Sequence, residues 1–272
     1  MSLQRLQNLF AQKNNNLLSI YLTAGYPTID AMPQLIRLLS EHSVDFIEAG
    51  MPFSDPLADG TTIQNSSSKA LQNGMTLSLY FEQIQQARLH TDLPILFMGY
   101  FNQLLKYGVE PFLQKCVQTG IDALILPDLP PEVYEKKYQK LFEKYDLGIS
   151  FLITPQTSLQ RIQYIDRLSS AFIYVVSASS TTGKTGAFTP EQIDYLKRIQ
   201  KIKTIHPKIT GFGIDNAEKF QIVNTYTNGA IIGSAFIKAI AKPSEYQQNA
   251  IRFIQKIKGN MPEKEADFSD KV

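Results

Sequence analysis

"AFIYVVSASSTTGKTGAFTPEQIDYL", residues 171–196, is the stretch on which two opposed interpretations of the fold depend. Its middle, residues 178–185, nearly fits the phosphate-binding loop G-x-x-x-x-G-K-[ST] of nucleoside triphosphatases, with Ala178 in place of the first glycine. In such a loop the next helix begins at the Gly-Lys-Thr itself, so that the first amides of the helix hold the phosphates. The interpretation therefore depends on where the next helix begins.

That helix begins too late for a triphosphate site. Thr189, Pro190 and Gln192 have the pattern of the N-cap, first position and third position of a capping box. A helix that starts at Pro190 leaves Lys184 inside a long loop, and no second motif provides an acidic Mg²⁺ ligand at a strand end. We expect a strand, a long loop and a helix, and no nucleotide site.

Apolar runs like the one that opens this stretch recur about every 30 residues, the length of one strand–helix unit. Amphipathic stretches with helical spacing, such as residues 32–42 and 132–145, lie between them. Eight units without a break in composition favour a closed parallel (β/α)₈ TIM barrel, an α/β fold, over a doubly wound open sheet. The eight runs are residues 18–23, 44–49, 93–100, 121–126, 148–153, 171–176, 208–213 and 229–234.

The two ends of the chain differ in character. Leu3, Leu6, Leu9 and Phe10 have helical spacing, which predicts an extra packed helix at the N-terminus. No linker or low-complexity tract divides the chain, so we expect a single domain over residues 1–272, with a charged, frayed tail from about residue 259.

Composition excludes several classes of function. The chain has 272 residues with 27 Lys and Arg against 25 Asp and Glu, a net charge of +2 that is too small for a nucleic-acid or anionic membrane surface. No apolar run is long enough to span a bilayer. Cys116 is the single cysteine, which allows no internal disulfide and favours a reducing, cytoplasmic setting.

The loop "EAGMPFSDPLADGTTIQ", residues 48–64, is the strongest candidate for catalysis, because barrel enzymes place their functional residues after the strands. It carries Glu48, Asp55 and Asp59, and Glu48 directly ends an apolar strand. Burial at the barrel mouth raises a carboxylate's pKa toward a value useful for proton transfer. The alternative is that Glu48 is a structural partner of an arginine.

The last two units have the pattern of a phosphate site. Gly211 and Gly213 follow one strand, with Asp215 and Glu218 expected as a capping box, and Gly233 with Ser234 joins the final strand to a helix. Glycines let backbone amides approach an anion, and helix N-termini favour negative charge. Ordinary turn glycines are the alternative interpretation.

Histidine and cysteine chemistry is not expected. His42, His90 and His206 fall in helices or connections away from the strand ends, and Cys116 has no companion ligand. We therefore expect no metal site, and acid–base chemistry from carboxylates.

The residues at the strand ends make the chain resemble the tryptophan synthase α subunit family over nearly its whole length. The segments that carry the resemblance are "YLTAGYP" (21–27), "EAGMPFSDPLADGTTIQ" (48–64), "MGYFN" (98–102), "LPDLPPEV" (126–133), "TTG" (181–183), "GFGI" (211–214) and "GSAFIK" (233–238). "PFSDPLADG" after a strand-ending Glu is the most specific of them.

The resemblance implies retro-aldol cleavage of indole-3-glycerol phosphate to indole and glyceraldehyde 3-phosphate, with Glu48 and Asp59 as catalytic residues. By the same resemblance the indole pocket comprises Tyr21, Met98, Tyr100, Ile125 and Tyr174. The phosphate positions are Gly183, Gly213, Gly233 and Ser234, and Thr182 is a lid residue that contacts Asp59.

The resemblance also implies a pyridoxal-phosphate β subunit as partner, in an αββα complex that receives the indole, and no cofactor in this chain. The chain departs from the family pattern at Ala49, Thr61 and Ser180, and Ser180 replaces a glycine of the lid. Two hypotheses compete with this one. The chain is another phosphosugar barrel enzyme, such as an isomerase or epimerase, or it is a non-catalytic activator of a β subunit.

Overall fold

A computed structural model of the chain describes residues 3–56, 59–177, 188–211 and 213–259. Eight parallel strands pair in chain order and close into a barrel, which confirms the (β/α)₈ expectation. Each of the eight expected apolar runs overlaps a strand. The strands are β1 Leu17–Thr23, β2 Phe46–Gly50, β3 Ile95–Met98, β4 Ala123–Ile125, β5 Gly148–Ile153, β6 Ile173–Val176, β7 Lys208–Gly211 and β8 Gly229–Ile232.

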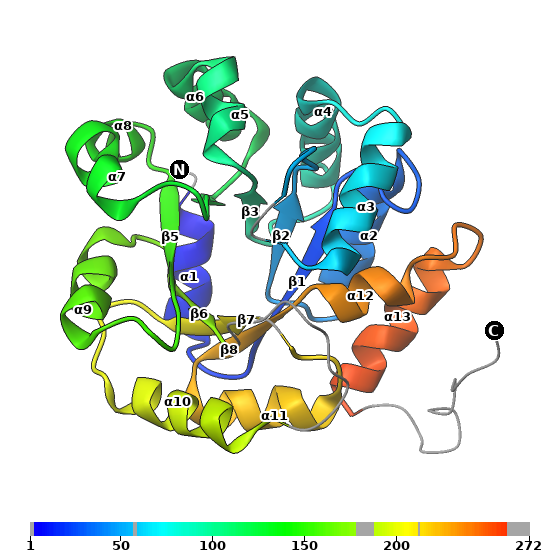
Figure 1. The fold of residues 1–272 in the computed structure, drawn as a ribbon. Helices are drawn as coiled ribbons and strands as arrows, with labels where there is room; N and C mark the ends of the chain where they lie inside the picture. The colour runs from blue at the N-terminus through cyan, green and yellow to red at the C-terminus, as the bar shows by residue number, and fades with distance from the viewer. Residues whose placement is uncertain (1–2, 57–58, 178–187, 212, 260–272) are drawn as a thin grey trace.

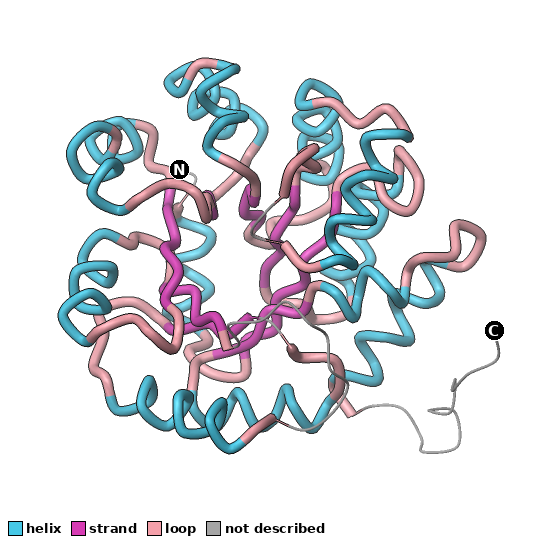
Figure 2. Tube along the Cα trace, in the orientation of Figure 1, coloured by secondary structure: helices cyan, strands magenta, loops and turns pink. Residues whose placement is uncertain are grey.

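Helices surround the strands on the outside of the barrel (Figures 1 and 2). Each buries at least one apolar side chain, as the amphipathic spacing of the sequence predicts. They are α1 Gln4–Gln12, α2 Ala31–Glu41, α3 Thr61–Gln72, α4 Leu77–Arg88, α5 Phe101–Tyr107, α6 Val109–Thr119, α7 Pro131–Lys137, α8 Gln139–Lys144, α9 Leu159–Leu168, α10 Pro190–Lys201, α11 Ala217–Tyr226, α12 Ser234–Ala239 and α13 Tyr246–Ile257. Within the described ranges, no helix has the length and apolar character needed to cross a membrane.

The expected N-terminal helix, α1, covers the N-terminal end of the barrel. Its Phe10 ring lies edge-on to the rings of Phe46 and Phe172, with centroids 6.4 and 6.5 Å apart. Arg5 Nε of the same helix donates to Asp122 Oδ1, just before β4, at 2.8 Å. Because one end of the barrel is filled in this way, the opposite end is the open mouth.

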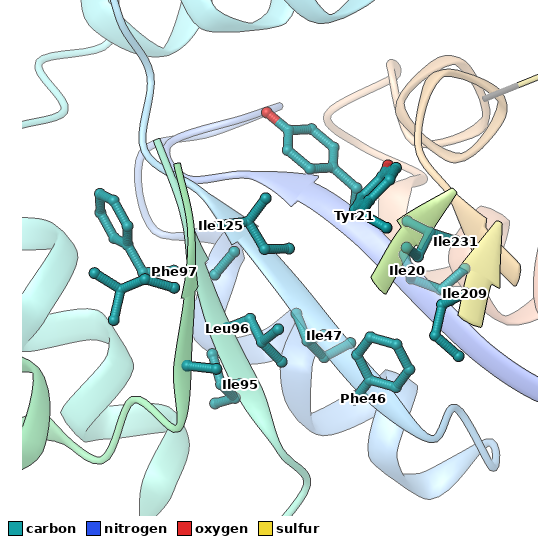
Figure 3. Packing of buried hydrophobic residues seen from close by; sticks show 14 of the residues in the cluster. Ile20, Tyr21, Phe46, Ile47, Ile95, Leu96, Phe97, Ile125, Ile209 and Ile231 are labelled. Carbon is teal, nitrogen blue, oxygen red and sulfur yellow. The ribbon is translucent and has the colours of Figure 1, made fainter. Parts of the chain in front are cut away.

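Strand register decides which side chains reach that mouth. Tyr21 of β1 pairs with Glu48 of β2, which pairs in turn with Leu96 of β3. Paired residues of parallel neighbours point to the same face of a sheet. Figure 3 shows Tyr21 and Ile125 at one end of the buried cluster and Phe46 at the other.

Helix starts confirm one expected cap and correct another. Thr189 and Gln192 form the capping box of α10, with Pro190 in the first turn, as the sequence predicts. The cap of α11, in contrast, is Asn216, whose side chain accepts from Lys219 N at 2.9 Å, and the Asp215–Glu218 box is wrong. Asp and Asn are equally good N-caps, so sequence alone could not decide between adjacent positions.

Candidate active site

Glu48 is a completely buried carboxylate at the inner face of β2. Neither of its carboxylate oxygens has a hydrogen-bond partner among the described residues, and no arginine of that part of the chain pairs with it. The structural role that the sequence left open is therefore not supported. Burial raises the pKa of Glu48 from 4.5 to about 8, so the side chain is mostly protonated at neutral pH.

Asp59 is partly buried and lies at the start of α3, where Asp59 N donates to Pro56 O at 3.0 Å. The Tyr100 hydroxyl donates to Asp59 Oδ2 at 3.3 Å, and the Tyr100 ring stacks on Phe53 with centroids 4.8 Å apart. Burial raises the pKa of Asp59 to about 6, and the bond from Tyr100 opposes the rise. Asp59 is thus ionised at neutral pH while Glu48 is not.

Two buried tyrosines bring these carboxylates into one site. Tyr21 and Tyr174 have pKa values raised first by burial, and the charges of both Glu48 and Asp59 add to the rise. The interaction weakens with distance, so Tyr21 of β1 and Tyr174 of β6 lie near both carboxylates. These residues are far apart in the sequence and meet only because the barrel closes.

Each tyrosine ring occupies the place of a missing side chain. A Cβ on Gly50 would lie 2.3 Å from Tyr21 Oη, and a Cβ on Gly211 would lie 2.2 Å from Tyr174 Oη. Gly211, expected to help bind an anion, therefore makes room for a tyrosine. Gly50 was not predicted from the sequence, because no neighbouring residue indicates which side chain of another strand packs against it.

The remaining predicted aromatic-pocket residues lie at the same mouth. A small hollow beside Asp59 is lined by Tyr21, Met51, Phe53, Ser67, Met98, Gly99, Tyr100 and Pro127. Ile125 is fully buried and pairs with Met98 across β3 and β4, so it extends the same apolar wall. Met51, Phe53 and Pro127 were not predicted from the sequence.

The predicted phosphate residues are only partly described. Gly233 precedes α12, and a Cβ there would lie 3.5 Å from Tyr21 Cβ, so it borders the mouth. Ser234 is the first residue of α12, and Gly213 has a φ of +76° with no atom near its added Cβ. Gly183 and Thr182, and with them the P-loop-like segment and Ser180, lie outside the described residues, as does the tail from residue 260.

A closed (β/α)₈ barrel that holds one buried and one partly buried carboxylate and an aromatic wall at the open end of its strands has the features of a barrel enzyme of acid–base type. The sequence model of the family described as "Tryptophan synthase alpha chain" matches residues 6–266. The chain belongs to the tryptophan synthase alpha chain family.

Relatives and solved structures agree with this assignment. The alpha chain of Christiangramia forsetii is 52% identical over 247 residues, which cover 91% of this chain and 96% of the relative. That of Bacteroides thetaiotaomicron is 40% identical over 256 residues, covering 94% of this chain and 100% of the relative. The crystal structure of the Pyrococcus furiosus subunit has a TM-score of 0.83 at 31% identity and covers 91% of this chain and 99% of its own.

Proposed function

We propose that Glu48 and Asp59 carry out the reaction of this family in the present chain, Glu48 as the proton-transfer group and Asp59 as the indole acceptor. By its family the protein is a lyase of tryptophan biosynthesis, which splits indole-3-glycerol phosphate into indole and glyceraldehyde 3-phosphate. The observation that carries the proposal is the buried carboxylate of Glu48 at the mouth, which has no hydrogen-bond partner in the described part of the chain. A buried acid without a structural partner is typical of a functional group.

Glu48 can serve both proton transfers of the cleavage. The carbon–carbon bond breaks once indole C3 is protonated and the neighbouring glycerol hydroxyl loses its proton. Glu48 is mostly protonated at neutral pH and gives its proton to C3. Its carboxylate then takes the hydroxyl proton as the aldehyde forms, which restores the acid, so no proton is gained or lost overall.

Asp59 supplies the negative charge that the intermediate needs. Protonation at C3 makes the indole ring cationic, and the N–H then becomes a stronger hydrogen-bond donor. An ionised Asp59 accepts from that N–H and stabilises the charge in a buried setting, where electrostatic interactions are stronger than in water. The bond from Tyr100 keeps this carboxylate in place.

The remaining site residues are assigned by the resemblance to the family. The indole lies against the apolar wall, and the phosphate lies over the ends of β7 and β8, where backbone amides and a helix N-terminus favour an anion. The wall is Tyr21, Met98, Tyr100, Ile125 and Tyr174; the phosphate residues are Gly183, Gly213, Gly233 and Ser234; Thr182 belongs to a lid.

We further propose that the product indole passes to a tryptophan synthase β subunit. Support comes from the similarity, with a TM-score of 0.81 at 30% identity, to a chain of the tryptophan synthase complex of Pyrococcus furiosus. The proposed assembly is αββα, in the cytoplasm. The pyridoxal phosphate belongs to the β subunit, and the alpha reaction needs only the side chains described above.

Indole release from indole-3-glycerol phosphate should follow a bell-shaped dependence on pH. Activity falls as the pH drops through about 6, because Asp59 becomes protonated and stops accepting, and as it rises through about 8, because Glu48 loses its proton. The measurement is kcat/KM for indole release between about pH 5 and 10. An isomerase or epimerase would transform a phosphosugar without releasing indole, and a pure activator would do neither; either result rejects the proposal.

Gly233→Val should weaken phosphate binding by about tenfold or more, ~1.4 kcal/mol, because the new side chain projects into the mouth near the proposed anion position. The measurement is the Kd of glycerol 3-phosphate by titration calorimetry. Ala241→Val, an exposed position beyond the other end of α12, is the control and should leave the Kd unchanged. Equal Kd values for the two variants would remove Gly233 from the phosphate site.

A further inference from the structure

The hydroxyl of Tyr21 is anchored by two further hydroxyls outside the residues named so far. Thr23 Oγ1 lies 3.4 Å from Tyr21 Oη and 2.7 Å from Ser66 Oγ, and all three side chains are buried. Ser66 Oγ is also 2.8 Å from Ile63 O of the same helix, α3. The hydroxyls form a chain from α3, across the end of β1, to the mouth.

Counting protons along this chain shows where the Tyr21 proton is available. Each hydroxyl has one proton to donate. Thr23 Oγ1 donates to Tyr21 Oη at 3.4 Å. Ser66 then supplies the proton between its own hydroxyl and that of Thr23, whose oxygens are 2.7 Å apart. The Tyr21 proton is not used within this chain of hydroxyls and is free for a group in the mouth.

The mouth offers Asp59 as an acceptor for this proton. Tyr21 and Asp59 line the same hollow, and of the two carboxylates Asp59 acts the more strongly on the Tyr21 hydroxyl. The ring cannot turn away through β2, since it lies over Gly50, where even a Cβ would be 2.3 Å from Oη. The phenol is thus held between an anchor on one side and a carboxylate on the other.

We propose that Tyr21 is a positioning residue for Asp59: its hydroxyl, oriented by Thr23 and Ser66, is a second phenolic donor that, with Tyr100, keeps the carboxylate ionised and turned toward the indole N–H. This inference rests on the proposed role of Asp59. It assigns the Tyr21 hydroxyl a function beyond the apolar contact that a pocket wall provides. Phenylalanine could supply that contact equally well.

The effect of such a donor on Asp59 has a definite sign. A hydrogen bond to the ionised form of a carboxylate lowers its pKa, so losing the proposed bond raises the pKa of Asp59. The charged and titratable groups that face this pair are Glu48 of β2, Tyr100 after β3 and Tyr174 of β6. None of these residues is itself replaced in a Tyr21 variant.

Tyr21→Phe should move the acid limb of the kcat/KM profile to higher pH by about one unit, the equivalent of one charge-assisted hydrogen bond. The alkaline limb, set by Glu48, should stay in place. Tyr21→3-fluorotyrosine should move the acid limb the other way, because fluorine makes the phenol a stronger donor while the side chain keeps almost the same shape. Tyr134→Phe, a buried tyrosine of α7 away from the mouth, should leave both limbs unchanged.

Outcomes of this series separate the inference from the proposed function. An acid limb that stays in place in both Tyr21 variants overturns the positioning role, and so does a shift in the same direction in both. The fluorinated residue fits the native space, so its pH profile still tests the positioning role if Tyr21→Phe folds poorly. Retained indole release in Glu48→Gln would instead reject the proposed function, whatever the Tyr21 variants do.

Discussion

Glu48→Gln should lower the rate of indole release by roughly 10²–10⁴-fold, the range that a positioned acid–base group contributes. The amide fills the same buried space on β2 but can neither give a proton to indole C3 nor take one from the glycerol hydroxyl. The measurement is single-turnover release of indole, beside a titration with glycerol 3-phosphate to show that binding persists. Turnover within about tenfold of the parent protein would reject Glu48 as the proton-transfer group.

The same variant should be more stable than the parent protein at alkaline pH. The folded pKa of Glu48, about 8, lies above its ordinary value of 4.5. A raised acid pKa contributes stability that is complete below the ordinary value and is lost as the pH rises through the folded value. The amide of the variant does not ionise, so the difference in unfolding free energy between variant and parent should grow from pH 5 to pH 8. Loss of activity with a gain in stability would distinguish a catalytic defect from misfolding.

Asp122→Asn should destabilise the fold by about 3–5 kcal/mol, the loss typical of a broken buried ion pair. Asp122 has no exposed side-chain surface and accepts from Arg88 Nη2 at 2.6 Å, from Arg5 Nε at 2.8 Å and from Ile95 N at 2.8 Å. Asn removes the charge that both guanidinium groups face and turns one acceptor into a donor. Urea unfolding at pH 7, with the midpoint and slope fitted together, measures the loss.

A surface pair and an activity assay provide the controls for Asp122. Glu110→Gln removes the exposed partner of Lys144 and should scarcely move the unfolding midpoint. Asp122 lies at the N-terminal end of β4, opposite the mouth, so Asp122→Asn should keep its turnover per folded molecule. A midpoint equal to that of Glu110→Gln would show that α1 and α4 are not held to the barrel through this carboxylate.

A structural feature can be predicted from a sequence pattern when the residues that cause it are neighbours in the chain. Each strand is a continuous apolar run and each helix has its own apolar spacing, so the barrel and the N-terminal helix could be predicted from the sequence. The start of α10 depends on Thr189, Pro190 and Gln192, which are neighbours, and it was predicted correctly. At α11 the pattern allowed two adjacent caps, and only the observed backbone selected Asn216.

The amino-acid sequence by itself determined the order of strands and helices, because apolar periodicity and capping act within a few residues of the chain. Tertiary structure decided that Glu48 has no partner in the described residues, that Asp122 has two arginines, and that Gly50 and Gly211 make room for tyrosines. These groups come from elements tens of residues apart in the chain. Barrel closure and strand register bring them together, so no spacing along one segment encodes their contacts, burial or protonation.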